Sequence, residues 1–235
     1  MRRTDLFIRA AVEAAGLDLR LLGGSSPPSP GELPHLVMAV PHTGHFDTVA
    51  VIWALLRGGY DPSRLGVVAK QSYWQSSHRR LLLWTMVGKS FLLDTDSIKG
   101  LPLLIEAMRE SQSELDAVIV YPQGTRDPEL KTEVFAASFG LSTKLGFPIL
   151  PVALLGLENV WPPGTSLLSA LVRGRQRECA GGRPIARVAI GSLIPPSNED
   201  SRQVRNQIRR EYLKAIIKIY LANGEPPPPF LKDNT

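Results

Sequence analysis

The stretch LVMAVPHTGHFDTVAVIWALLR, residues 36–57, indicates how the chain folds. It begins with five apolar residues, continues through a loop that contains two histidines, and ends in a longer apolar segment. A short buried strand followed by a loop and a helix is the repeating unit of α/β proteins. We therefore expect a strand at 36–40, a helix at 48–57 and a ligand-binding loop between them, because ligands bind at the carboxyl ends of strands in such sheets.

The rest of the chain continues this alternation of short β-branched runs and longer helix-like segments. Further strands are predicted at 65–69, 90–93, 117–121, 148–154 and 187–194. Further helices are predicted at 74–86, 99–110, 134–145 and 201–221. The predicted fold is α/β, a single domain with a mostly parallel mixed sheet and helices on both faces.

The two ends of the chain differ from this central part. Residues 1–34 are predicted to form an amphipathic helix that ends at Gly16 and a Pro/Ser linker, residues 35–222 the domain, and residues 223–235 a Pro-rich tail. The apolar side of the N-terminal helix is expected to pack on the core, with a lipid surface as the alternative; it comprises Leu6, Phe7, Ala10 and Ala14. Segment 156–184 breaks the alternation and is either a functional lid or a disordered excursion.

Composition limits the classes of protein that the sequence can encode. Among 235 residues, 27 Lys and Arg exceed 22 Asp and Glu, which gives a formal net charge of +5 and favours an anionic partner. The single cysteine, Cys179, excludes an internal disulfide and a cysteine zinc cluster, and therefore indicates a reducing compartment. No apolar run approaches the roughly 18 residues of a transmembrane helix. Arg9 and Glu13 interrupt the N-terminal stretch, which otherwise has some features of a signal peptide.

His42 and Asp47 lie in the loop between the first predicted strand and its helix. A turn at Gly44 allows Asp47 to accept a hydrogen bond from one imidazole nitrogen, which leaves the other nitrogen as a general base near neutral pH. The alternative is that Asp47 caps a helix that starts at Thr48 and that His42 is an incidental loop residue.

A second polar loop, residues 123–126, follows the strand predicted at 117–121. Gly124 permits close approach of the backbone to a ligand, and the guanidinium of Arg126 binds phosphate or carboxylate through two hydrogen bonds. Alone, this loop is also compatible with an ordinary turn that carries a surface arginine. Together the two loops provide a base, a carboxylate that orients it and an anion-binding group, a combination that an enzyme site needs.

These loops carry a resemblance to the glycerolipid acyltransferases, the family that includes 1-acylglycerol-3-phosphate and glycerol-3-phosphate acyltransferases. The first family motif, Asn-His, four residues and Asp, corresponds to PHTGHFD at 41–47. The third, Phe-Pro-Glu-Gly-Thr-Arg, corresponds to YPQGTR at 121–126. The second and fourth correspond to 88–94 and to ILPVAL at 149–154. All four occur in family order, and the resemblance spans residues 35–195.

The resemblance implies transfer of a fatty acyl group from acyl-CoA or acyl carrier protein to a hydroxyl of a lysophospholipid such as 1-acylglycerol-3-phosphate. His42 would deprotonate the acceptor hydroxyl, and Asp47 would hold the imidazole tautomer and stabilise the imidazolium. The substrate-binding residues would be Gln123, Gly124, Thr125 and Arg126. It implies no covalent enzyme intermediate, no metal and no cofactor.

Three departures from the family pattern bear on the acceptor. Pro41 replaces Asn, Gln123 replaces Glu, and Asp94 or Thr95 stands where an arginine often ends the second motif. Gln123 cannot fill any role that needs a carboxylate at this position. The missing arginine removes one expected phosphate contact, which weakens the case for lysophosphatidate more than the case for O-acyl transfer. Lys70 is either a replacement positive charge or a solvated residue at the end of its strand. A different lipid acceptor, or a phospholipid transacylase, is therefore the alternative.

Other classes of protein have some support. A metal-dependent hydrolase could use His42, His45 and Asp47 as ligands, but no histidine follows His78. A non-catalytic lipid-binding member of the family is another alternative. Nucleic-acid binding is supported by basic residues of the last helix, but no recognised module accompanies them; these residues are Arg202, Arg205, Arg209, Arg210, Lys214 and Lys218.

We expect no nucleic-acid partner. The arginines of segment 173–183 and the basic side of the last helix are expected to face lipid headgroups or an acidic carrier protein. The sequence thus predicts a cytoplasmic protein that is peripherally associated with an anionic membrane surface.

Overall fold

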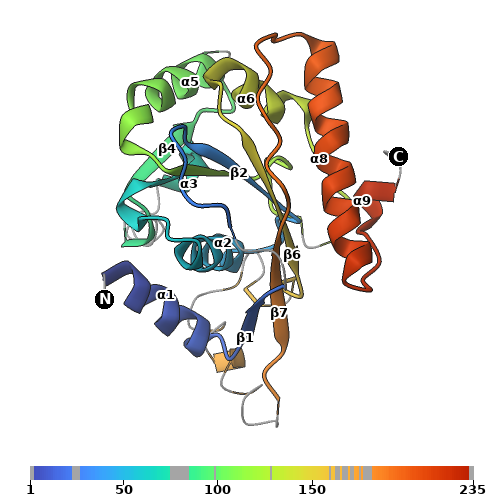
Figure 1. Cartoon of the computed structure of the whole chain (residues 1–235). Helices are drawn as coiled ribbons and strands as arrows, with labels where there is room; N and C mark the ends of the chain where they lie inside the picture. The colour runs from blue at the N-terminus through green and yellow to red at the C-terminus, as the bar shows by residue number, and fades with distance from the viewer. Residues whose placement is uncertain are drawn as a thin grey trace.

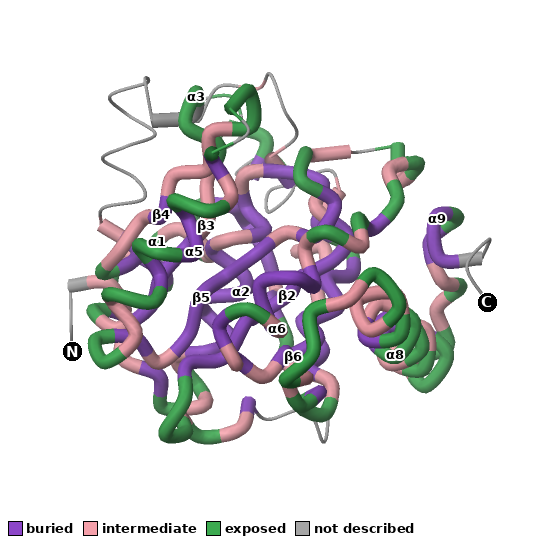
Figure 2. Tube along the Cα trace, turned by 90° about the horizontal axis from the view of Figure 1, so that it is seen from above, coloured by how far each residue is buried: buried purple, intermediate pink, exposed green. Residues whose placement is uncertain are grey.

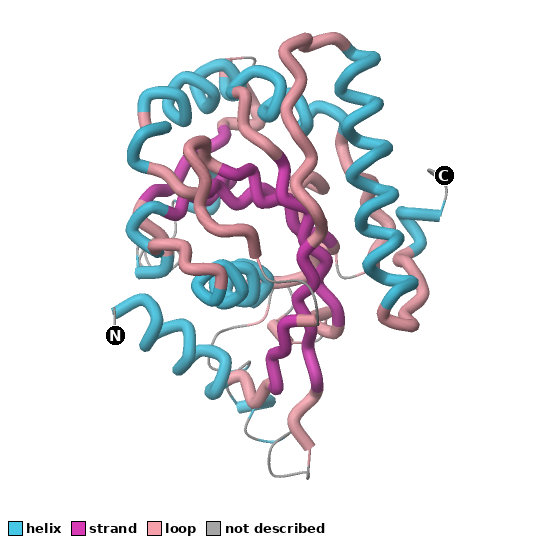
Figure 3. Tube along the Cα trace, viewed as in Figure 1, coloured by secondary structure: helices cyan, strands magenta, loops and turns pink. Residues whose placement is uncertain are grey.

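A computed structural model of the chain describes residues 3–22, 27–74, 85–97, 99–127, 129–158, 160–161, 165, 169, 172–174, 176 and 182–232. Within these residues, strands from both halves of the chain form a single twisted sheet (Figures 1 and 3). The strands are β1 (Asp18–Leu21), β2 (His35–Val40), β3 (Leu65–Lys70), β4 (Lys89–Leu93), β5 (Ala117–Val120), β6 (Ile149–Leu155) and β7 (Ile185–Ile190). Their order across the sheet is β1-β7-β6-β2-β5-β3-β4.

The sheet is mixed, as predicted. Strands β6, β2, β5, β3 and β4 are parallel to one another. Strand β7 is antiparallel to β6, and β1 is parallel to β7. Because β2, β3 and β5 are adjacent and parallel, the loops that follow them meet at one edge of the sheet.

Helices cover both faces of this sheet (Figure 1). Buried residues of α1 (Arg3–Ala14) and α2 (Phe46–Arg57) belong to the apolar cluster on one face. Buried residues of α5 (Gly100–Glu110), α6 (Gly140–Leu145) and α8 (Arg202–Ala222) belong to the cluster on the other. The short elements are α3 (Gln71–Trp74), α9 (Pro229–Lys232) and the 3-10 turns Pro62–Arg64, Gln112–Glu114 and Ala136–Phe139.

The central strands are buried along their whole length, and Figure 2 shows them at the centre of the molecule. Every residue of β2, β5 and β6 is buried because helices cover both sides of the sheet. Such strands are continuous apolar runs rather than alternating patterns. This property explains why the sequence predicts β2, β5 and β6 to within one or two residues.

The structure adds a strand that the sequence analysis does not predict. Strand β1, with the sequence DLRL, pairs with β7 at the edge of the sheet. It has only four residues. Leu19 is the only one of them that is buried, and Arg20 is exposed. The N-terminal segment is therefore part of the sheet, and residues 1–34 contain more than a helix and a linker.

The N-terminal helix packs on the core through a different face from the predicted one. Ile8 is 1% exposed, and Phe7, Ala11 and Val12 pack against the same apolar cluster. Leu6 is 57% exposed, and Ala10 and Ala14 are exposed as well. The expectation that α1 contacts the core is confirmed, but three of the four residues assigned to its buried side are wrong.

Two other predicted elements have different bounds in the structure. The helix predicted at 134–145 begins later, because the Phe135 backbone N–H still donates to the Pro122 carbonyl and the residue is extended. Strand β7 begins two residues earlier and ends four residues earlier than predicted. Beyond it, only an isolated bridge joins Ile194 to Ile149.

Several predictions concern residues outside the described part of the chain. They include most of the helix predicted at 74–86, most of segment 156–184, His78, Arg175, Arg177 and Cys179.

The Pro-rich tail lies against the domain. Leu231 is fully buried, and Phe230 is nearly so. Both side chains belong to the apolar cluster that also contains α5, α6 and α8.

Candidate active site

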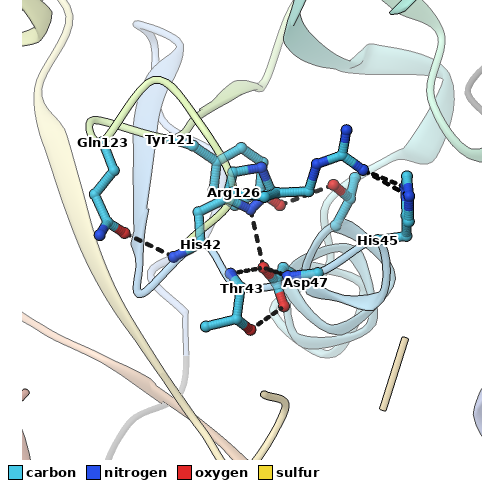
Figure 4. Close-up of polar contacts among 9 residues, drawn as sticks. His42, Thr43, His45, Asp47, Tyr121, Gln123 and Arg126 are labelled. Carbon is cyan, nitrogen blue, oxygen red and sulfur yellow. Dashed lines mark hydrogen bonds and ion pairs between the residues drawn. The ribbon is translucent and has the colours of Figure 1, made fainter. Parts of the chain in front are cut away.

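His42 and Asp47 lie together between β2 and the first turn of α2 (Figure 4). The Asp47 carboxylate is 2.9 Å from Nδ1 of His42, which is the hydrogen bond that the sequence predicts. The same carboxylate accepts the backbone N–H groups of Thr43, at 2.7 Å, and Gly44, at 2.9 Å. The Thr43 hydroxyl is a more distant fourth donor, at 3.4 Å. Four donors therefore compensate the burial of a carboxylate that has no exposed surface.

The alternative role for Asp47, as a helix cap, is not what the structure shows. Helix α2 begins at Phe46, so Asp47 is already inside its first turn. His45 occupies the cap position, and its side chain makes no capping hydrogen bond to the helix. The Asp47 carboxylate points back to the preceding loop instead. If the Nδ1 proton of His42 is donated to Asp47, Nε2 is the nitrogen that can act as a base.

Tyr121, the residue directly after β5, lies on the His42 imidazole. The two rings are stacked with their centroids 3.7 Å apart and their planes 14° apart. The Tyr121 hydroxyl is 2.8 Å from Oγ1 of Thr48 in α2. Tyr121 thus connects the end of β5 to both the histidine and its helix, a contact that the motif spacing does not reveal.

Arg126 lies beside the second histidine of the first loop. One guanidinium nitrogen is 2.5 Å from Nδ1 and 2.7 Å from Nε2 of His45. The His45 ring is also 5.0 Å from the ring of Trp161, and the His45 backbone N–H donates to the Trp161 carbonyl. The sequence suggests His45 only as an alternative metal ligand. Its position two residues before Asp47 is the one sequence signal for a role in the site.

A pocket of about 390 Å³ opens at this edge of the sheet. His42, Gly124, Thr125 and Arg126 line it, and so does Lys70 at the end of β3. Apolar side chains form much of the remaining wall: Val67, Val68, Ala69, Leu93, Leu101, Leu104, Val120 and Leu141. The wall of the pocket therefore combines polar side chains, among them the histidine, with many apolar ones.

Gln123 is the one predicted substrate-binding residue that the structure does not bring to this pocket. Its side chain has no exposed surface and is not part of the lining. Its amide instead joins His42 to Thr132. Asp47 also lies behind the lining, where it contacts His42 rather than the cavity.

The arrangement of the two histidines bears on the metal alternative. Nδ1 of His42 faces Asp47, whereas His45 faces the cationic guanidinium of Arg126. A guanidinium at this distance opposes a second cation at the same ring. Among the residues that the structure describes, no three His, Cys, Asp or Glu side chains are grouped so that they could hold a metal ion.

The fold and the site place the chain among α/β proteins with a ligand pocket at the carboxyl edge of a largely parallel sheet. Residues 30–155 match the Acyltransferase family, and the chain belongs to that family.

The fold is similar to that of the 1-acyl-sn-glycerophosphate (LPA) acyltransferase PlsC from Thermotoga maritima. The TM-score is 0.61 at 17% sequence identity, and the similarity covers 92% of this chain and 78% of that one. No curated protein sequence matched the chain. In the described part of the chain, no helix is both long and apolar enough to cross a lipid bilayer.

Proposed function

We propose that the protein is an O-acyltransferase that moves a fatty acyl group from a thioester donor to a lipid hydroxyl. The observation that carries the proposal is the hydrogen bond from Asp47 to His42, a histidine that lines a pocket with many apolar side chains. Membership of the Acyltransferase family supports acyl transfer as the reaction class.

In the proposed reaction, Nε2 of His42 takes the proton of the acceptor hydroxyl as its oxygen attacks the thioester carbonyl. The tetrahedral intermediate then collapses with cleavage of the C–S bond. The leaving thiolate takes the proton back from the imidazolium, so that an ester and a free thiol are formed without an acyl-enzyme. Asp47 keeps the proton on Nδ1 and stabilises the transient imidazolium, as an orienting carboxylate does in serine hydrolases.

We infer that the acceptor is a lysophospholipid such as 1-acylglycerol-3-phosphate. Arg126 and Thr125 line the same pocket as His42, and a guanidinium suits a phosphate group. Lys70 lines the same pocket and supplies a second positive charge. The apolar side chains of the pocket suit a fatty acyl chain.

The donor is proposed to be acyl-CoA or acyl carrier protein. Both carry anionic groups at the end of the phosphopantetheine arm that lies away from the thioester. Helix α8 exposes basic side chains at Arg202, Arg210, Lys214 and Lys218. The other two basic residues predicted on this side of the last helix form ion pairs within the protein. Arg205 pairs with Asp200, and Arg209 pairs with Glu133. Arg183 likewise pairs with Glu13.

A product analysis tests the proposed reaction. The purified protein is incubated with lysophosphatidate, a zwitterionic lysophospholipid or a monoacylglycerol, with acyl-CoA and acyl carrier protein as donors in separate reactions. With lysophosphatidate as the acceptor, we expect the diacyl product and the free thiol to form in equal amounts. Formation of free fatty acid alone, abolished by a chelator, would instead support a metal-dependent hydrolase.

A second candidate function uses the same site with a different lipid. Thr95, rather than an arginine, lines the pocket at the end of the second motif, which removes one phosphate contact expected from the resemblance. Transfer from a phospholipid donor to a lysophospholipid without any thioester would identify the transacylase.

We also propose that the protein works at the cytoplasmic surface of an anionic membrane. The exposed basic side chains of α8 support this location, because they are attracted to anionic headgroups. Co-sedimentation with vesicles should then require anionic lipid and weaken with salt. Equal binding to neutral and anionic vesicles at low salt would contradict it.

A further inference from the structure

Gln123 forms a bridge between the loop that carries His42 and Thr132, further along its own loop. Figure 4 shows the contact with His42. The Gln123 Oε1 accepts the backbone N–H of His42 at 2.7 Å. Its Nε2 donates to the carbonyl oxygen of Thr132 at 2.8 Å. The side chain is completely buried, and both ends of its amide are hydrogen-bonded, so little of it remains for a ligand.

The other backbone group of His42 is held by the same loop. The backbone N–H of Asp127 donates to the His42 carbonyl at 2.7 Å. Both backbone polar groups of His42 are therefore bonded to residues 123–127, while the ring of Tyr121 covers its imidazole. The position of His42 thus depends on this loop as well as on Asp47.

The anchor for Gln123 is itself fixed. The Asp127 carboxylate accepts the backbone N–H groups of Glu129, Lys131 and Thr132. Burial raises the pKa of Asp127, but these hydrogen bonds outweigh that effect and hold the pKa below its ordinary value. The loop that contains the Thr132 carbonyl is therefore held in place by hydrogen bonds from its backbone to the Asp127 carboxylate.

An amide meets the requirements of this bridge, and a carboxylate does not. The His42 N–H needs an acceptor, and the Thr132 carbonyl needs a donor. An ionised glutamate would satisfy only the first and would face the Thr132 carbonyl with a second acceptor in a buried place. The departure from the family motif at this position is thus matched by its surroundings.

We infer that Gln123 is a positioning residue for His42 and not a substrate contact. The inference rests on the proposed function of His42 as the general base. It predicts that Gln123 sets the rate of the chemical step, because misplacing the base weakens proton transfer, and that it leaves acceptor affinity unchanged.

Kinetics of Gln123→Leu and Gln123→Glu test the inference when compared with Tyr220→Phe. The control removes a different buried bond between a side chain and the backbone, the one from the Tyr220 hydroxyl to the Leu154 carbonyl. We expect kcat per folded molecule to fall about 100-fold in Gln123→Leu, the order of loss reported for small misplacements, with KM for the acceptor unchanged. Gln123→Glu should also lose kcat, and Tyr220→Phe should lose only stability. A raised KM with unchanged kcat would show that Gln123 contacts substrate, and unchanged values of both would overturn the inference.

A measurement that needs no activity separates this inference from the proposed function. Imidazole nitrogen NMR reports the tautomer of His42, and amide hydrogen exchange reports protection of its backbone N–H. In Gln123→Leu, we expect faster exchange at His42 and loss of the single tautomer. If both signals stay as in the unsubstituted protein, the inference is wrong even when acyl transfer is established. If the signals change but no acyl transfer is found, the positioning role stands and the proposed function fails.

Discussion

At the scale of single residues, Tyr121 has two contacts that substitutions can separate. Its ring stacks on His42, whereas its hydroxyl reaches Thr48. The face of an aromatic ring attracts a cation, so the stack favours the imidazolium that forms in the transition state. Tyr121→Phe keeps the stack, and Tyr121→Leu removes it.

We therefore predict that kcat falls about tenfold in Tyr121→Leu, which corresponds to about 1.4 kcal/mol, and changes much less in Tyr121→Phe. Steady-state kinetics across pH would measure both. Equal losses in the two variants would assign the effect to the hydroxyl instead.

Arg126 is the residue whose substitution tests the acceptor. Lysine keeps the charge at position 126 but loses the planar pair of donors that suits a phosphate. We predict that Arg126→Lys raises KM for lysophosphatidate about tenfold or more, since a charge-assisted hydrogen bond contributes about 1.5–3 kcal/mol. KM for a monoacylglycerol should stay the same. A similar rise for both acceptors would mean that Arg126 does not bind the phosphate.

At the scale of elements, β2 begins with a buried titratable group. Nδ1 of His35 is 2.6 Å from the Tyr60 hydroxyl, and the His35 side chain is almost fully buried. Burial lowers the pKa of His35 from its ordinary value of 6.5, and the opposing attraction of Asp116 is smaller. A neutral imidazole can accept a hydrogen bond from the Tyr60 hydroxyl, whereas an imidazolium cannot.

The direction of the pH dependence follows from this pKa. Below pH 6.5, the unfolded chain binds a proton at His35 that the folded chain resists, so the free energy of unfolding falls as the pH falls, by at most about 1.4 kcal/mol per pH unit. In urea unfolding between pH 7 and pH 5, the free energy of unfolding should fall less steeply for His35→Gln than for the unsubstituted protein. The glutamine can still accept a hydrogen bond from the Tyr60 hydroxyl, but it does not titrate. Parallel curves for the two proteins would contradict the prediction.

The elements also show how far the sequence predicts the structure. The apolar runs of β2, β5 and β6 indicate strands because both of their faces are buried. Strand β1 is missed because four residues at a sheet edge give too short a pattern. The order of the strands across the sheet is not predicted either, because no local sequence pattern encodes it.

The same limit applies to the site. The hydrogen bond between His42 and Asp47 is predictable because a single turn joins the two residues. The bridge from His42 through Gln123 to Thr132 is not predictable from the sequence. It depends on two contacts that no local pattern encodes: His42 and Gln123 are 81 positions apart, and Gln123 and Thr132 are 9 positions apart. The sequence therefore predicts the Gln123 side chain in the pocket, whereas in the structure this side chain is buried and does not line the pocket.

At the scale of the whole molecule, both ends of the chain pack on the domain predicted at 35–222. The N-terminal segment contributes β1 and the buried side chains of Ile8 and Leu17, and the tail contributes Phe230 and Leu231. Full burial of one such side chain contributes about 1.5–3 kcal/mol, against a total stability of about 5–15 kcal/mol. We propose that the folding unit includes both ends.

A fragment of residues 35–222 should consequently have a much lower melting temperature than the whole chain or fail to fold. Fragments that lack only one end should lie in between, because the two ends pack on opposite faces of the sheet. Thermal unfolding followed by circular dichroism would measure this series. A 35–222 fragment as stable as the whole chain would restore the narrower boundaries.

The central claim is that His42, oriented by Asp47, is the general base of acyl transfer. The most direct measurement is the rate of product formation at saturating donor and acceptor for the purified protein and for His42→Ala, with folding of both checked by circular dichroism. Because a general base contributes about 10²–10⁴-fold to a rate, we predict a loss of that size in the alanine variant. Acyl transfer that continues undiminished in folded His42→Ala would contradict the claim.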